Sequence, residues 1–139
     1  MSDTWAATCR LVLARAGGRC EYCRMSQSLQ GATFHVEHVV PQSAGGADSA
    51  DNLALACPAC NLSKSNRTTA VDPDTSQEVP LFHPRSHTWA DHFGWDGVKL
   101  LGRTPTGRAT VQAFGLNFPR RQLIRMAEGN FGLFPPDSA

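Results

Sequence analysis

The chain has 139 residues and a net charge of +1, and hydrophobic residues make up 41% of it. This length allows one domain, or a small domain with an extension, and the charge excludes a general polycation. The chain lacks an apolar run long enough to span a bilayer and a leader-like pattern at its start. We therefore expect a cytoplasmic protein with no membrane partner.

Hydrophobic periodicity, β-branched runs and Gly or Pro stops divide the first half of the chain into short elements. In chain order these are a helix over residues 4–16, a strand over 32–40, a loop over 42–50, a strand or helical turn over 51–56, and a helix over about 59–66. Cys9 lies among the apolar positions of the first helix, which predicts a buried core thiol.

In the second half, turn signals over residues 68–84 predict a linker or surface loop. The elements expected after it are strands over 89–95 and 98–101 turned at Asp96-Gly97, a helix from Thr104-Pro105 to about 116, and a helix over 120–128 closed by Gly129. Three histidines, at positions 83, 87 and 92, lie among aromatic residues, and we interpret them as a packing cluster rather than a metal site.

Four of the five cysteines form two Cys-x-x-Cys pairs, Cys20 with Cys23 and Cys57 with Cys60. In a reducing compartment such pairs favour metal ligation over disulfides, the alternatives being unliganded thiols or a redox pair. Two pairs suit one tetrahedral Zn²⁺, and four thiolates leave no position open for water. The spacing therefore predicts a structural zinc site.

Glu37, His38, Asn52 and Asn61 lie between and just after the two cysteine pairs. A hard cation such as Mg²⁺ prefers oxygen ligands, which suits Glu37 and the amide of Asn61 and leaves His38 as a general base. Asn52 is interpreted in three ways: it accepts the N–H of the base, it fixes the loop that carries the base, or it is an ordinary turn residue.

The string Val36-Glu37-His38-Val39-Val40-Pro41, then Gly45-Gly46, Asn52-Leu53 and Cys57-x2-Cys60-Asn61-x2-Lys64, resembles the HNH endonucleases over about residues 18–67. The resemblance implies an α+β protein: a ββα-metal core over residues 1–70 stapled by the structural zinc. Residues 71–139 would then be an extension of short strands and helices. That part resembles the tail of small stand-alone bacterial and phage HNH proteins, and it either braces the core or adds DNA-binding surface.

The same resemblance implies a metal-dependent DNA endonuclease that uses one Mg²⁺ or Mn²⁺. Glu37 and Asn61 would be ligands of this catalytic metal, His38 the general base and Asn52 its support. The family more often has Asp at the position of Glu37, and His is common at the position of Asn61. The rival hypothesis is a non-catalytic zinc-knuckle module that binds nucleic acid or a protein.

Several polar residues are candidate nucleic-acid contacts: His35, Lys64, Arg67, Arg121 and Arg125. The last two belong to a stretch of six cations without an acid between Asp96 and Glu128, which is either a phosphate-binding face or a solvated one. His35 can equally be an extra ligand or an inert strand residue. The chain contains no recognisable target-recognition domain, so action within a dimer or a larger complex stays open.

Overall fold

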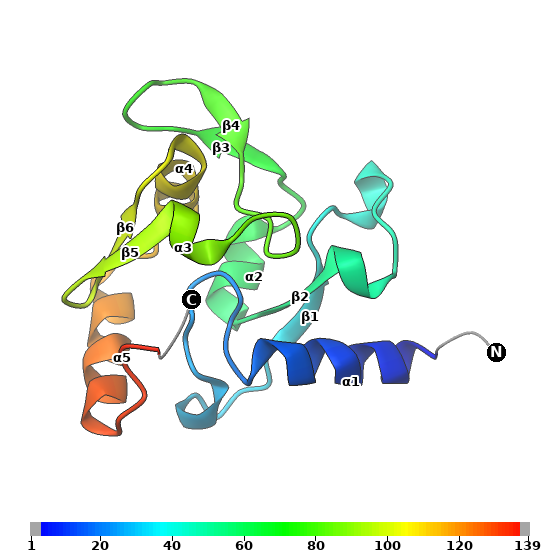
Figure 1. Cartoon of the computed structure of the whole chain (residues 1–139), viewed down its shortest axis with the longest axis horizontal. Helices are drawn as coiled ribbons and strands as arrows, with labels where there is room; N and C mark the ends of the chain where they lie inside the picture. The colour runs from blue at the N-terminus through cyan, green and yellow to red at the C-terminus, as the bar shows by residue number, and fades with distance from the viewer. Residues whose placement is uncertain (1–3, 137–139) are drawn as a thin grey trace. The chain divides into compact units, whose positions relative to one another are not determined.

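The computed structural model describes residues 4–136, and the chain divides into two compact units, residues 1–66 and 67–139 (Figure 1). Helices and small antiparallel sheets occur together, as an α+β protein requires. None of the described helices is long and apolar enough to cross a membrane. The division of the chain into a nuclease core and an extension at residue 70 stays a prediction. The boundary between the two compact units, after residue 66, lies four residues before it in the sequence.

The first unit contains four main elements: α1 (Trp5–Ala16), β1 (His35–His38), β2 (Leu53–Ala56) and α2 (Pro58–Lys64). β1 and β2 form an antiparallel pair in which Glu37 faces Ala54 and His38 faces Leu53. Both α1 and α2 pack against this pair. All four residues of β2 are buried, so β2 is the centre of the core of this unit.

Helix α1 begins and ends as its sequence predicts. The Thr4 side chain caps it by accepting a hydrogen bond from Ala7 N at 3.0 Å, and Gly17 ends it in the left-handed conformation at φ 64°. The helix buries only Val12, however, and Cys9 is half-buried. The prediction of a buried Cys9 thiol was wrong, because one narrow stripe of α1 faces the sheet and Cys9 lies beside it.

Strand β1 is shorter than the predicted strand over residues 32–40, since its partner β2 has only four residues. Beyond His38 the chain pairs with Asn52 instead: Val39 N donates to the Asn52 carbonyl at 2.9 Å. The ambiguous segment 51–56 contains both predicted alternatives, because a helical turn over Ala50–Asn52 leads directly into β2.

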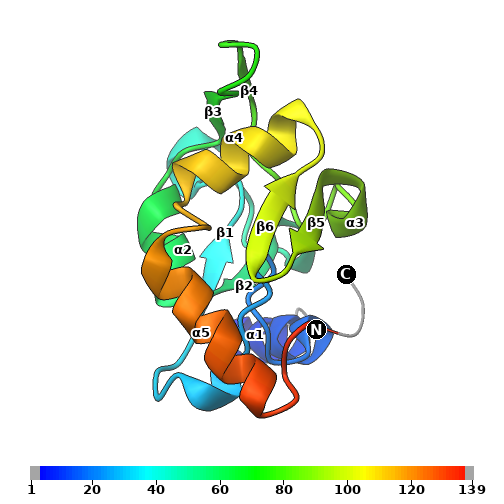
Figure 2. The ribbon, with the colours of Figure 1, turned by 90° about the vertical axis from the view of Figure 1, so that its left-hand side faces the viewer.

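The described part of the second unit contains two antiparallel strand pairs and three helices. These are β3 (Thr69–Val71), β4 (Glu78–Pro80), α3 (Trp89–His92), β5 (Phe93–Asp96), β6 (Lys99–Gly102), α4 (Pro105–Ala113) and α5 (Pro119–Asn130). β3 pairs with β4 and β5 pairs with β6. Helix α4 packs against β6 and against the β3–β4 hairpin (Figure 2).

Residues 68–84 were predicted to be a linker or surface loop, but they contain the β3–β4 hairpin, so this prediction was wrong. The Asp72 carboxylate accepts hydrogen bonds from Asp74 N at 3.1 Å and Thr75 Oγ1 at 2.8 Å, which folds the turn between β3 and β4. Arg108 of α4 binds both oxygens of the same carboxylate at 3.0 Å. This bidentate contact holds the pKa of Asp72 well below its usual range.

The hairpin turn at Asp96-Gly97 is confirmed, but the preceding strand is shorter than predicted. Trp89–His92 forms a helical turn, which brings the Trp89 ring to 5.1 Å from the Phe93 ring between centroids. Thr104 caps α4 as predicted, with Pro105 at its first position. Gly129 does not close α5, which continues to Asn130.

Candidate active site and metal centre

The four cysteines of the two predicted pairs meet in the first unit. Their sulfur atoms all lie within 4.8 Å of one another, and all four residues are buried. A tetrahedral zinc with Zn–S bonds of about 2.3 Å needs sulfur pairs separated by about 3.8 Å. The Cys23 and Cys57 sulfurs are 3.8 Å apart. The donor set and its spacing therefore fit zinc.

The backbone shapes each cysteine pair for a metal. Cys23 N lies 3.5 Å from Cys20 Sγ, and Cys60 N lies 3.4 Å from Cys57 Sγ, so an amide supports one sulfur in each pair. Cys57 is also the N-cap of α2, with Pro58 at the first helical position. Burial raises the pKa of the Cys20 and Cys60 thiols, so four thiolates need a cation among them.

A second polar site opens beside β1 as a cavity of about 300 Å³. Its walls carry Glu37, His38 and His35 from β1 and Asn61 from α2. The pairing of β1 with β2 and the packing of α2 on both strands bring these side chains from separate parts of the sequence to one cavity. Three of the four central motif residues thus line it, and Asn52 does not.

Glu37 is buried, and both of its carboxylate oxygens have protein partners. The Tyr22 hydroxyl donates to Oε2 at 2.8 Å, and the Lys64 ammonium lies 3.2 Å from Oε1. Burial raises the pKa of Glu37 above its ordinary value, and the charge of Lys64 and the Tyr22 hydrogen bond oppose that rise. Tyr22 lies between Cys20 and Cys23, so the turn of the first cysteine pair is linked to the cavity wall through Glu37.

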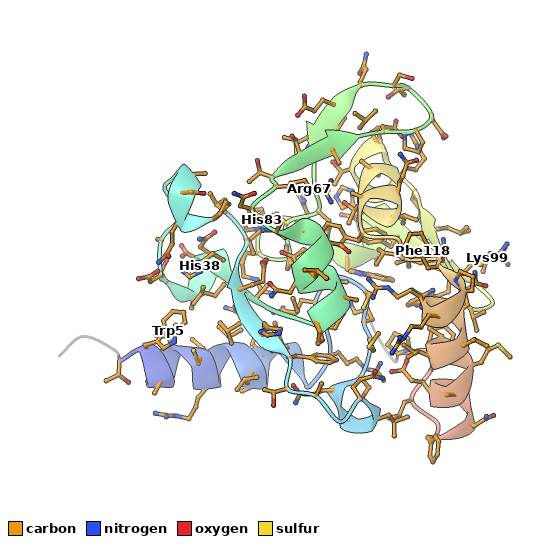
Figure 3. The ribbon with its side chains drawn as sticks, turned by 180° about the vertical axis from the view of Figure 1, so that it is seen from behind. Trp5, His38, Arg67, His83, Lys99 and Phe118 are labelled. Atoms are coloured by element: carbon orange, nitrogen blue, oxygen red, sulfur yellow. The ribbon has the colours of Figure 1, made fainter. Side chains whose placement is uncertain are left out.

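His38 is held by residues from two other segments. Its Nε2 lies 2.8 Å from Asp48 Oδ1, and its ring stacks on the Trp5 indole with centroids 6.0 Å apart and planes 9° apart (Figure 3). The hydrogen bond to His38 lowers the pKa of the Asp48 carboxyl. The Asn61 amide, in contrast, makes no hydrogen bond within residues 4–136, which leaves its oxygen available to a ligand.

Asn52 fixes the loop that follows His38, which is one of the roles considered from the sequence. Its amide donates to the carbonyls of Val40 and Ala47, each at 2.9 Å, and its oxygen accepts from Val40 N at 2.9 Å. The described part of the chain shows no hydrogen bond from Asn52 to the His38 ring. A Cβ on Gly46 would lie 1.7 Å from the Val40 carbonyl oxygen, so this close approach requires glycine.

The candidate nucleic-acid contacts separate by burial. Lys64 is 1% exposed and donates to the His38 carbonyl at 3.1 Å as well as pairing with Glu37. Arg121 and Arg125 are 6% and 5% exposed, and their guanidinium groups donate to backbone carbonyls within the second unit. Burial argues against phosphate contacts by these three residues. His35 and Arg67 are exposed.

The aromatic cluster of the second unit packs as predicted. The His87 and His92 rings lie 4.9 Å apart between centroids, and the Phe82 ring lies within 6 Å of both. His83 Nδ1 accepts hydrogen bonds from Arg85 N and Ser86 N. Within the described residues, the four-cysteine cluster is the one group of three or more His, Cys, Asp or Glu side chains close enough to hold a metal.

Sequence reasoning missed the partners that hold the site, Tyr22, Asp48 and Trp5. Tyr22 and Asp48 are 15 and 10 residues from the side chains that they bind. A signal was nevertheless present: Tyr22 lies between Cys20 and Cys23, so the cysteine cluster fixes the backbone that carries it. Asp48 follows a Gly-Gly pair, which indicates a tight loop that returns toward the motif.

Residues 20–67 match the family model described as HNH endonuclease. The matched segment includes both cysteine pairs and every residue of β1, β2 and α2. This segment, about a third of the chain, is therefore similar to the HNH endonuclease domain, which suggests a nuclease-type function. Neither the curated proteins nor the solved structures gave a match to this chain.

Proposed function

We propose that this protein is a metal-dependent DNA endonuclease in which β1, β2 and α2 form a ββα-metal unit. The observation that carries the proposal is the cavity shared by Glu37, His38 and Asn61. These side chains supply a carboxylate, an imidazole and an amide oxygen, the set that hydrolysis of a phosphodiester needs. The match of the segment to the HNH endonuclease family supports the same reaction class.

Each residue has one role in this proposal. Glu37 and Asn61 would hold the catalytic Mg²⁺ or Mn²⁺, which supplies stabilisation of negative charge on the phosphate and the leaving oxygen. Each Glu37 oxygen keeps a lone pair beyond its hydrogen bond to Tyr22 or Lys64. His38 takes a proton from the attacking water, and Asn52 holds the loop behind it. The products would carry 5′-phosphate and 3′-hydroxyl ends.

The cysteine cluster has a different role, because all of its ligand positions are thiols. We propose that it holds a structural Zn²⁺ that stabilises the first unit and takes no part in hydrolysis. Exposed His35 at the cavity edge and Arg67 at the start of the second unit remain candidates for contacts with DNA.

Cleavage of supercoiled plasmid DNA with Mg²⁺ or Mn²⁺ tests the proposal. We expect wild-type protein to cleave, and His38→Ala to lose roughly 10²–10⁴-fold in rate, the usual contribution of a general base. The variant should keep its zinc content and circular dichroism. His87→Ala is the matched control, because it removes an imidazole from the second unit and should cleave normally.

Absence of cleavage by the wild-type protein under all divalent cations, with intact zinc and DNA binding, would favour the non-catalytic zinc-knuckle module instead. Equal rates in the wild type and His38→Ala would leave nuclease activity standing but would remove His38 as its general base.

A further inference from the structure

The His38 imidazole has only one ring nitrogen engaged by the protein. Nε2 lies 2.8 Å from Asp48 Oδ1, while Nδ1 makes no hydrogen bond in the part of the chain that the structure describes. An ionised carboxylate is only an acceptor, so the neutral ring must carry its proton on Nε2. Nδ1 is then the nitrogen with a free lone pair, which is what a general base needs.

The loop that carries Asp48 is held in place at three points. Gln42 Nε2 donates to Asp48 Oδ1 at 2.8 Å, so the carboxylate is fixed beside the imidazole. Asn52 binds the carbonyl of the preceding residue, Ala47, and both backbone groups of Val40. Gly46 allows the loop to touch Val40. The turn therefore returns the chain so that Asp48 meets His38.

We propose that Asp48 is the positioning residue of His38 in the nuclease reaction, and that it sets Nδ1 as the atom that accepts the proton from water. This inference rests on the proposed function. Asp48 touches neither the water nor the phosphate and acts only through the imidazole. Asn52 acts one step further away, through the loop, and the Trp5 indole limits tilting of the ring from one face.

The proton and electron balance of the step is simple. A water proton moves to His38 Nδ1 while the water oxygen forms a bond to phosphorus. The bond from phosphorus to the 3′-oxygen breaks, its electron pair stays on that oxygen, and the oxygen takes a proton from solvent. Asp48 stays ionised throughout and balances the charge of the imidazolium ion that forms.

The exposure of Asp48 predicts that its effect falls on rate and not on folding. Its side chain is 64% exposed, and an exposed ion pair contributes little to stability. Asp48→Asn should therefore fold normally and lower kcat by roughly 3- to 30-fold, less than loss of His38 itself, because the imidazole remains. The Mg²⁺ requirement should stay unchanged, and any fall in KM for DNA should match that of a control variant that also loses one negative charge.

Asp51→Asn is the matched control. Asp51 is an exposed acid in the same loop region, and its carboxylate is hydrogen-bonded to Ser49 Oγ instead of a histidine. Removal of a negative charge near a polyanion would lower KM in both variants alike. A fall in kcat confined to Asp48→Asn supports the positioning role of Asp48, whereas an equal fall in kcat in both variants overturns it.

A double-mutant cycle asks whether Asp48 acts through His38. In a His38→Ala background, Asp48→Asn should have no further effect on the residual rate. If it lowers that rate as strongly as in the wild type, Asp48 acts elsewhere and the proposal is wrong.

Nitrogen NMR of the imidazole at one fixed alkaline pH separates this inference from the proposed function. We expect wild-type His38 to carry its proton on Nε2 and Asp48→Asn to give a mixture of both tautomers. Identical tautomer populations in the two proteins overturn the inference even if DNA is cleaved. A protein that cleaves no DNA, with the Nε2–H tautomer still dependent on Asp48, overturns the nuclease role while leaving the contact intact.

Discussion

The unit before residue 67 buries Glu37 at the wall of a cavity, with Lys64 paired to it. The unit after it buries Arg121 and Arg125 against its own backbone. In the first unit, the Glu37 carboxylate keeps lone pairs beyond its contacts with Tyr22 and Lys64. The Asn61 amide lines the same cavity and has no hydrogen-bond partner within residues 4–136. In the second unit, the guanidinium groups of Arg121 and Arg125 donate hydrogen bonds to backbone carbonyl oxygens. The comparison teaches that a charged residue in the sequence is a candidate binding residue only when the fold leaves some of its hydrogen-bonding capacity unused.

The largest effect is expected when the four-cysteine cluster of the first unit is disrupted. Cys57→Ser should lose zinc and most of the cooperative unfolding transition of residues 1–66, because structural zinc contributes on the order of 10 kcal/mol of binding free energy. Zinc content and urea unfolding followed by circular dichroism measure both effects. Cys9→Ser should retain them, since Cys9 lies outside the cluster. A folded, zinc-free Cys57→Ser protein would contradict the prediction.

The next test concerns the oxygen ligands at the cavity. Glu37→Gln and Asn61→Ala should each raise the Mg²⁺ concentration for half-maximal cleavage by roughly tenfold or more, because each removes a favoured oxygen ligand. Glu37→Asp is the conservative control, since it keeps the carboxylate. An Mg²⁺ titration of plasmid cleavage provides the measurement. Unchanged titrations in both variants would point to other ligands, and His35 would be the first candidate.

For the second unit, Arg125→Met should lower stability without altering DNA binding. The guanidinium donates to Val98 O at 2.8 Å and Leu116 O at 2.6 Å and lies over the Trp95 ring. Loss of such charged hydrogen bonds costs about 2 kcal/mol, measured by urea unfolding. The slope of log affinity against log salt should stay unchanged. Arg120→Met, at an exposed neighbour, is the control for stability, and a flatter salt slope in Arg125→Met would restore its DNA role.

The smallest expected effect is a pH dependence of the second unit. Burial, together with the charge of His87, lowers the pKa of His92, so the unfolded chain binds its proton more readily than the folded chain. Stability from this group is complete above the unfolded pKa of about 6.5 and falls as the pH drops below it. The midpoint of thermal unfolding should therefore change less between pH 7.5 and pH 5.5 in His92→Gln than in the wild type. Equal changes of the midpoint in the two proteins would rule out His92 as a source of the pH dependence.

Local patterns in the sequence were enough to predict the metal cluster and the elements around it. Cysteine spacing, the Thr4 cap and the Asp96-Gly97 turn depend on neighbours within a few residues, and the structure agrees with each. Glu37 and Asn61 could be placed near His38 because the motif implied it. The family model recognises the same motif, although the chemical roles of these residues stay predictions.

The sequence could not predict which charges would be buried, since this depends on contacts between distant segments. Lys64 pairs with Glu37, which is 27 residues away in the sequence, and Arg108 pairs with Asp72, which is 36 residues away. The Asp72 contact turned a predicted linker into a hairpin, and it also removes Arg108 from the stretch interpreted as a phosphate-binding face. A run of cations in the sequence therefore overestimated the positive charge that this unit presents.

Tyr22 limits how the first unit can be re-engineered. Its hydroxyl holds Glu37 from inside the turn between Cys20 and Cys23, so that turn positions a carboxylate of the cavity wall as well as supplying sulfur atoms to the cluster. A designer who exchanged the turn for a disulfide-bonded or metal-free replacement would need to restore a phenol at the same point. Without it, such a replacement would change the stability of the first unit and the position of the Glu37 carboxylate together.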